Sequence, residues 1–339
     1  MREAFLSLTP ADRIEALAVA ASRGGRPPHI LEKDVWVVWA LAQLFDSPFG
    51  EHLVFKGGTS LSKAYRAIQR FSEDIDVTYD IRAIAPDLVD AASDNPVPPS
   101  KSQAKKWTDT IKDRLSTWVS ETVLPHLNAR VAATRVPAQT RAEADCIYIE
   151  YARDAEGYGY VAPRIKIEFG ARSTGEPAEA HEIRCDAAES LPEVLFPTTQ
   201  ARVMRVERTF WEKATAIHVF CRQGQVAERQ ARHWYDLAQL DIGGFAQAAI
   251  TARDIAELVS THKTWFFAAK DAQGQVINYE AAVSGGLTLI PAGPALEALE
   301  ADYLQMVRDA LFLGDAPSVG SVIERCREIE ARANAKTGA

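Results

Sequence analysis

Residues 55–80, FKGGTSLSKAYRAIQRFSEDIDVTYD, place a pair of glycines shortly before two aspartates that are separated by one residue. The apolar residues before Gly57 predict a short strand, and the apolar spacing after the glycines predicts a helix. In DIDVTYD polar and apolar residues alternate, so a strand here would place Asp74 and Asp76 on one face. Two neighbouring carboxylates repel each other. The segment therefore predicts a strand–turn–helix–strand unit that directs two acids at one spot, where a cation would offset their repulsion.

The residues on either side of this unit predict an α+β fold. Capping residues and helical periodicity predict two N-terminal helices, over residues 10–24 and 30–45. A Pro- and Ser-rich loop over residues 84–102 and another helix follow. Alternating residues then predict three strands, DCIYIEYA, RIKIEFG and HEIRCD, with a hairpin signal AEGYG between the first two.

From about residue 200 onward the apolar spacing becomes helical, beginning with RVMRVERTFWEKATAIHVF. We therefore expect two domains. The first, over residues 1–200, contains the mixed sheet and the N-terminal helices. The second, over residues 201–339, is all-helical and completes the active-site cleft.

Composition excludes several classes of protein. No apolar run approaches the about 18 residues that a membrane-spanning helix needs, and the N-terminus lacks the apolar segment of a signal peptide. The four cysteines are scattered and form no C-x-x-C pair. This usage predicts reduced thiols in a cytoplasmic protein without a membrane partner, and it argues against a metal cluster.

The charge of the chain is uneven. The net charge is −8, yet residues 201–233 contain seven Lys or Arg and three Glu, a local charge of +4. A basic segment on an acidic protein suits a polyanion held in one cleft, although a solvated helix face has the same composition. We expect this segment to contact the phosphates of a nucleic-acid acceptor, with binding that weakens as salt increases.

The paired acids are suited to hold a divalent cation. Residues i and i+2 of a strand point the same way about 6.6 Å apart, and Mg²⁺ prefers oxygen ligands while keeping water or substrate phosphates in its shell. Two such ions can activate an attacking hydroxyl and stabilise the leaving group of a phosphoryl transfer. In RIKIEFG, Lys166 and Glu168 alternate with apolar residues, so both would face Asp74 and Asp76 if the two strands are neighbours. Exposed acids on an edge strand remain an alternative for D-x-D alone.

The glycine turn is suited to bind an anion. Gly57 and Gly58 can adopt backbone angles closed to other residues and carry no side chain that blocks approach. The helix after them would present N–H groups and a positive dipole end, and Thr59 and Ser60 add hydroxyl donors. The spacing fits neither a Walker loop nor a dinucleotide fingerprint. A plain strand-to-helix turn is the alternative, but the turn and the D-x-D together are more specific than either feature alone.

The wording of several stretches resembles a known family. The stretches are LEKDVWVVWAL, FKGGTSLSKAY, RFSEDIDV, FWEKATA and RHWYDLAQL, in this order. They resemble the AbiEii/AbiGii-type toxins of bacterial toxin–antitoxin and phage-abortive systems, a branch of the polymerase-β-like nucleotidyltransferases. The similarity spans about residues 30–240 and is most specific in GG[ST]SL and S-x-D-[IL]-D. It implies a polymerase-β-like nucleotidyltransferase core with a mixed sheet, followed by the all-helical half.

The resemblance also implies a role for each matching residue. It places Gly58, Thr59 and Ser60 in the nucleotide-binding turn and Ser72 beside the metal, and it makes Lys213 and Asp236 necessary for activity. Strand alternation adds Glu168 as the third acid. We therefore expect three sets of residues: catalytic Asp74, Asp76, Glu168, Lys213 and Asp236; nucleotide-binding Gly57, Gly58, Thr59, Ser60, Ser72 and Lys166; and metal-binding Asp74, Asp76 and Glu168.

The residues themselves support the later pair. Asp236 lies among apolar neighbours in HWYDLAQL, and a buried aspartate needs a partner, for which Lys213 is a candidate. A lysine near a triphosphate acts as a point charge against the phosphates. A surface ion pair between Lys213 and a neighbouring glutamate is the alternative.

Together these features predict an enzyme, a nucleotidyltransferase that depends on Mg²⁺ or Mn²⁺. It would transfer NMP from an NTP to an acceptor hydroxyl, with the 3′ end of tRNA as the favoured acceptor, and act as the toxin of a toxin–antitoxin or phage-defence system. The implied partners are an NTP, an RNA acceptor and a cognate antitoxin. Nucleotidylation of a protein or small molecule, and a non-catalytic nucleotide-binding module, are the alternatives; such a module would be expected to lose at least one acid.

Overall fold

The computed structural model describes residues 3–72, 74–155, 162–309 and 311–335. The chain forms two compact units. The first comprises Met1–Ala64, Ser72–Pro96 and Trp107–Val203, and the second comprises Tyr65–Phe71, Val97–Lys106 and Met204–Ala339. The second unit thus takes one short segment from between the glycine turn and the D-x-D strand. The functional division into two domains at residue 200 remains a prediction.

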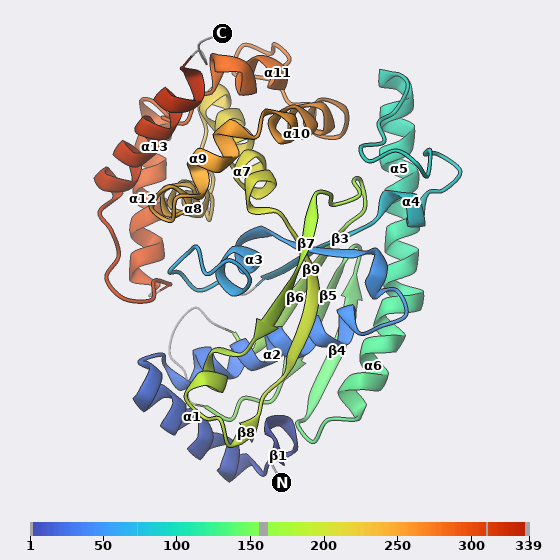
Figure 1. Cartoon of the computed structure of the whole chain (residues 1–339), viewed down its shortest axis with the longest axis vertical. Helices are drawn as coiled ribbons and strands as arrows, with labels where there is room; N and C mark the ends of the chain where they lie inside the picture. Colours follow the sequence, from blue (N-terminus) through green and yellow to red (C-terminus); the bar gives the residue numbers. More distant parts are fainter. Residues whose placement is uncertain (1–2, 73, 156–161, 310, 336–339) are drawn as a thin grey trace. The chain divides into compact units, whose positions relative to one another are not determined.

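A mixed sheet of seven described strands forms the first unit, in the order β4-β5-β6-β3-β2-β9-β7 (Figure 1). The strand β3 (Asp74–Tyr79) pairs parallel with β6 (Arg164–Gly170) and antiparallel with β2 (Leu53–Lys56). The other strands are β4 (Ala138–Glu143), β5 (Cys146–Tyr151), β7 (Ala178–Arg184) and β9 (Thr198–Met204). The D-x-D segment is therefore an interior strand of the sheet, and the alternative of an edge strand is wrong.

Alternating residues give this sheet one apolar and one polar face. On the apolar side, Trp36 of α2 (Pro28–Phe45) stacks on Tyr151 at 5.0 Å, and Trp118 of α5 (Lys101–Trp118) stacks on the last residue of β3 at 4.1 Å. Helices therefore cover the apolar face. The fully buried residues that the central strands contribute to it include Ile75, Val77, Ile147, Ile149, Ile165 and Ile167.

Local sequence signals account for the remaining elements of the first unit. The helix α1 (Pro10–Gly24) begins as predicted, because the Thr9 side chain accepts a hydrogen bond from the Asp12 amide, and it ends at Gly25 in the left-handed conformation. Short β1 and β8 pair parallel with each other. The bounds of the others are β1 (Glu3–Ala4), α3 (Gly57–Lys63), α4 (Ile81–Ile84), α6 (Leu124–Ala132) and β8 (Val194–Leu195).

The second unit contains mainly helices in its described residues. Its core includes two fully buried tryptophans whose indole N–H groups donate to backbone carbonyls: Trp211 to Ala249 at 2.8 Å and Trp234 to Leu289 at 2.7 Å. The helices are α7 (Val206–Gln223), α8 (Ala231–Ile242), α9 (Phe245–Thr251), α10 (Arg253–Phe266), α11 (Tyr279–Ala281), α12 (Pro294–Arg308) and α13 (Val319–Asn334).

Two sequence predictions need comment. The helix expected to begin in RVMRVERTF instead begins at Val206, because the residues up to Met204 continue β9, whose Val203 pairs with Phe55 of β2. The hairpin signal AEGYG lies outside the described residues except for its first residue. The two strands around it do pair antiparallel, as predicted.

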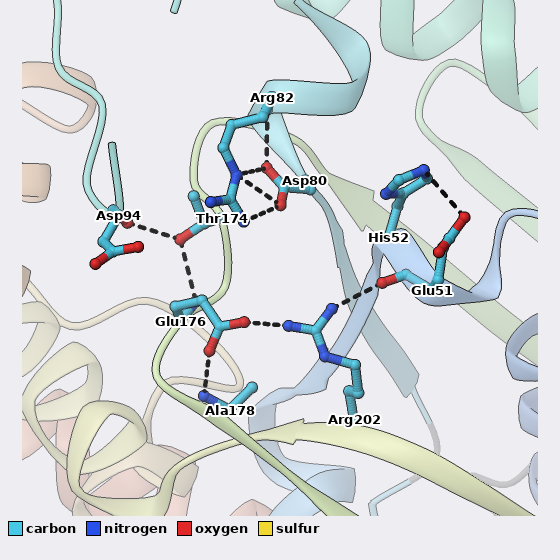
Figure 2. Close-up of polar contacts among 9 residues, drawn as sticks. All are labelled: Glu51, His52, Asp80, Arg82, Asp94, Thr174, Glu176, Ala178 and Arg202. Atoms are coloured by element: carbon cyan, nitrogen blue, oxygen red, sulfur yellow. Dashed lines mark hydrogen bonds and ion pairs between the residues drawn. The ribbon is translucent and has the colours of Figure 1, made fainter. Parts of the chain in front are cut away.

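A polar network holds the end of β3 that is distant from the paired aspartates (Figure 2). Asp80 accepts hydrogen bonds from the amide and guanidinium of Arg82. Glu176 accepts from Arg202, and Arg202 donates to the Glu51 carbonyl oxygen at 2.7 Å. The network also fixes the predicted loop after α4, because the Thr174 hydroxyl donates to the carbonyl oxygen of residue 94 at 3.0 Å. Charges paired in this way support a structural role.

Among the residues that the structure describes, no helix combines the length and the apolar character needed to span a bilayer.

Candidate active site

The polar face of the sheet brings the predicted acids of the first unit together. Asp74 and Asp76 lie two residues apart on β3, so their side chains point the same way. In the parallel pairing with β6, Asp74 lies opposite Lys166 and Asp76 lies opposite Glu168. The prediction that RIKIEFG neighbours the D-x-D strand, with Glu168 on the same face, is confirmed.

Gly57 makes room for one of these acids. Its φ angle is +80°, and a Cβ added there would lie 2.2 Å from Oδ2 of Asp76. Any other residue would therefore have to displace the carboxylate as well as adopt a left-handed backbone. The glycine turn and the D-x-D motif, which the sequence presents as two features, meet at this contact.

The hydroxyl groups of the turn are engaged within the protein. The Thr59 hydroxyl can donate to the carbonyl oxygen of Asp74 at 2.5 Å or to Oγ of Ser72 at 2.9 Å. Ser60 donates to the carbonyl oxygen of Gly57 at 2.9 Å, and both Thr59 and Ser60 are buried. These bonds join the start of α3 to the start of β3. An anion at the turn would then meet mainly backbone N–H groups, because the first amides of a helix have no partner within it.

Lys166 and Glu168 form an ion pair on the polar face. Burial alone would lower the pKa of Lys166, but its hydrogen bond to Glu168 and the charge of Glu168 raise it. The ammonium therefore stays charged at neutral pH beside the two aspartates. A cation placed there is consistent with the predicted role of Lys166 in binding phosphate.

The donor set fits a hard divalent cation. Asp74, Asp76 and Glu168 offer carboxylate oxygens on one face, which suit Mg²⁺ or Mn²⁺. Among the described residues, no three His, Cys, Asp or Glu side chains are already gathered as a metal-binding group. Mg²⁺ commonly takes only one or two protein carboxylates and completes its shell with substrate phosphates and water. The arrangement is therefore adequate for an ion that arrives with a nucleotide.

The second unit pairs the two later residues. Nζ of Lys213 on α7 lies 2.8 Å from Oδ2 of Asp236 on α8, as the sequence predicted for a buried aspartate. The sequence did not predict a third member, Arg70, whose Nε and Nη2 donate to the two oxygens of the same carboxylate at 2.7 and 2.8 Å. Arg70 stands in the quoted stretch RFSEDIDV, but nothing in its spacing relates it to a residue so distant along the chain.

Burial and charge set the ionisation of this triad. Burial would raise the pKa of Asp236, but Arg70 and Lys213 outweigh it through their charges and hydrogen bonds and hold that pKa well below its usual range. Burial lowers the pKa of Lys213, and the charge of Asp236 opposes this effect. Asp236 is therefore ionised at neutral pH within the fully buried triad.

The basic segment over residues 201–233 is less available than its composition suggested. Five of its seven cations form ion pairs with neighbouring acids. These pairs are Arg202–Glu176, Arg205–Glu207, Arg208–Glu212, Lys213–Asp236 and Arg222–Asp271. The segment therefore presents less unbalanced positive charge to a polyanion than the count of residues predicts.

A second cation that sequence reasoning overlooked is Lys56, the last residue of β2. It lies opposite Asp76 in the antiparallel pairing of β2 with β3. Its place directly before Gly57 was the available signal, because a strand that ends in K-G-G carries its last side chain to the edge of the turn.

Comparison with known protein families gives one decisive result. The family model described as "Nucleotidyl transferase AbiEii toxin, Type IV TA system" matches residues 39–325. The chain belongs to this family. The resemblance indicated by the motifs is thereby confirmed, and the match continues well beyond residue 240, where the motifs end. As a member of the AbiEii family, the protein is a nucleotidyltransferase toxin of a type IV toxin–antitoxin system, which implies a nucleotide substrate and a cognate antitoxin.

Solved structures also include a similar chain, MenT4, a nucleotidyltransferase toxin from Mycobacterium tuberculosis H37Rv. The two chains share 20% sequence identity with a TM-score of 0.43, and the match covers 96% of this chain and 98% of MenT4. Comparison with curated proteins gives no match.

Proposed function

We propose that this AbiEii family member is a Mg²⁺- or Mn²⁺-dependent enzyme with a polymerase-β-like core that transfers NMP from an NTP to the 3′ end of tRNA in the cytoplasm. The observation that carries the proposal is the convergence of Asp74, Asp76 and Glu168 on one sheet face, directly against the Gly57 turn. Acids on neighbouring strands beside a close-approach turn suit a metal-bound triphosphate.

The transfer itself needs no covalent enzyme intermediate. The acceptor oxygen attacks the α-phosphorus, the bond from that phosphorus to the bridging oxygen of the β-phosphate breaks, and pyrophosphate leaves while the hydroxyl proton passes to solvent. A divalent ion bound at the carboxylates would neutralise phosphate charge and lower the pKa of the acceptor hydroxyl.

This chain's own residues bind and orient the substrate. Asp74 and Asp76 supply ligand oxygens, with Glu168 as the third acid. The turn over residues 57–60, joined to β3 through Thr59 and Ser72, would hold the triphosphate close to those oxygens.

Cations and acceptor complete the proposal. Lys166, and Lys213 in the second unit, would provide positive charge for the phosphates, with Asp236 holding Lys213 in place. The acceptor follows the family resemblance stated from the sequence, and so does the role in phage defence. The ion pairing within residues 201–233 reduces the charge available for RNA, so the acceptor requires its own test.

The test uses purified protein, each of the four NTPs labelled with ³²P at the α-phosphate, Mg²⁺ and total cellular RNA. We expect label in tRNA-sized RNA, no label when the ³²P is at the γ-phosphate, and loss of labelling after periodate oxidation of the RNA 3′ ends. Asp76→Asn should remove the signal. Label in protein or in a small molecule would overturn the tRNA acceptor, and the absence of any transfer with every NTP would overturn the proposed enzyme.

A further inference from the structure

Arg70 is buried in a place where its charge is only partly neutralised. Its side chain is 4% exposed and that of Asp236 is 0% exposed. The Asp236 carboxylate receives both Arg70 and Lys213, so the three groups together carry a net charge of +1. Buried charges are normally balanced. An excess of positive charge in a buried triad therefore favours an anionic ligand for one of the cations.

The geometry shows which cation has the weaker hold on the carboxylate. Arg70 uses two nitrogens and contacts both oxygens, the bidentate arrangement that fixes a carboxylate in its plane. Lys213 makes one contact, to Oδ2, and shares that oxygen with Nη2 of Arg70. Arg70 thus takes up much of the negative charge that would otherwise neutralise Lys213.

The backbone around Arg70 is also fixed from both sides. Arg70 pairs with Phe312 in an isolated antiparallel bridge, in which the Leu313 amide donates to the Gln69 carbonyl oxygen at 2.8 Å. The Gln69 amide donates to the hydroxyl of Tyr235, the residue next to Asp236 on α8. The guanidinium and its carboxylate are therefore held by neighbouring points of one packed cluster. Such a cluster preserves orientation, which catalysis requires, in addition to stability.

Arg70 is also close in the chain to the carboxylates of β3. Three residues separate it from Asp74. Holding the segment before β3 therefore restrains the strand that carries the paired acids, while the same side chain restrains the Lys213–Asp236 pair.

We propose that Arg70 is a positioning residue for the transfer reaction: its guanidinium fixes Asp236 and keeps Lys213 incompletely neutralised, so that the Lys213 ammonium serves the phosphates of the nucleotide. This inference rests on the proposed function, in which Lys213 acts on phosphate. Arg70 itself touches neither substrate nor metal in this assignment.

The experiment compares Arg70→Gln and Arg70→Lys with a matched control, Arg13→Gln. Arg13 is likewise buried and bidentate, on Asp154 at 2.5 and 3.0 Å, but it lies in the first unit and outside the proposed site. Each protein is assayed at a temperature at which circular dichroism shows it to be fully folded. Steady-state kinetics with the NTP then give kcat and KM separately.

We expect Arg70→Gln to lower kcat by about 100-fold and Arg70→Lys, which keeps the charge without the bidentate grip, by about 10-fold. Arg13→Gln should change kcat by less than about 3-fold even if its melting temperature falls as far. Equal kcat and KM in Arg70→Gln and Arg13→Gln would overturn the role of Arg70 and leave the proposed function intact. If Arg70→Gln does not fold, the comparison of Arg70→Lys with Arg13→Gln decides in the same way. Wild-type protein that transfers nothing would instead overturn the proposed function.

Discussion

The Cα of Gly57 packs so closely against the side chain of Asp76 that a Cβ on the glycine would lie 2.2 Å from Oδ2. The turn is thereby matched to the carboxylate beside it. A backbone that approaches a carboxylate this closely can also approach the phosphates that a carboxylate-bound metal would hold. The contact links the two sequence features from which the function was inferred.

Gly57→Ala should therefore impair activity beyond its effect on folding. At φ +80° an L-residue costs about 1–2 kcal/mol of stability, and the Cβ must in addition push the Asp76 carboxylate away. We expect kcat/KM for the NTP to fall by about 100-fold, on the scale of losing an oriented active-site group.

Gly25→Ala is the matched control for this prediction. Gly25 has φ +73°, but nothing lies within 4 Å of a Cβ added there. It should lose similar stability in urea unfolding and keep its activity. Equal activity of the two variants would show that the contact with Asp76 has no functional importance.

Asp76→Asn should weaken binding of the divalent ion and increase stability slightly or leave it unchanged. The amide removes one ligand charge and also the repulsion between neighbouring carboxylates. Mn²⁺ binding, followed by electron paramagnetic resonance, should weaken by about 10-fold or more. Glu143→Gln, an exposed acid on β4, is the control and should bind Mn²⁺ like the wild type. Unchanged Mn²⁺ affinity in Asp76→Asn would remove Asp76 from the proposed metal site.

Asp236→Ala should be strongly destabilising. It leaves Arg70 and Lys213 without their shared carboxylate inside the second unit, and breaking a buried pair costs about 3–5 kcal/mol. Glu328→Ala removes the partner of Arg325 in a pair with side chains 43% and 51% exposed, and it should cost about 0–1 kcal/mol. Urea unfolding of both variants measures the difference. Similar losses in the two would mean that the triad is more hydrated than its burial indicates.

His218 should make stability depend on pH on the acid side of neutrality. Burial, with a smaller effect of Arg222, lowers the pKa of His218 to about 4 from its ordinary 6.5, and its Nδ1 accepts a hydrogen bond from the Thr288 amide at 3.0 Å. Between these values the unfolded chain binds the extra proton, so stability is lost as pH falls from 6.5 toward 4. The slope from one proton is at most about 1.4 kcal/mol per pH unit.

The control for this prediction is His218→Gln, which keeps a hydrogen-bond acceptor but does not titrate. Its free energy of unfolding should depend less steeply on pH than that of the wild type between pH 4.5 and 6.5. Parallel curves for the two proteins would show that His218 does not contribute this dependence.

Local patterns made part of the structure predictable. Thr9, Pro10 and Gly25 define α1 through capping and backbone preference, which act between near neighbours in the chain. The alternation in DIDVTYD and RIKIEFG determined which face each side chain would take, because that periodicity is a property of any strand. The strand β4, AQTRAE, carries no comparable apolar signal and forms through its pairing with β5.

The sequence by itself thus determined the turn, the D-x-D strand and the family, because these depend on residues close together in the chain. Only the tertiary structure decided that Gly57 packs against Asp76, that Lys166 neutralises Glu168 and that Arg70 grips Asp236. It also showed that most cations of residues 201–233 are already paired. Partners so distant in sequence meet only when strands and helices pack, and the strength of a charge depends on the burial and the neighbours that packing creates.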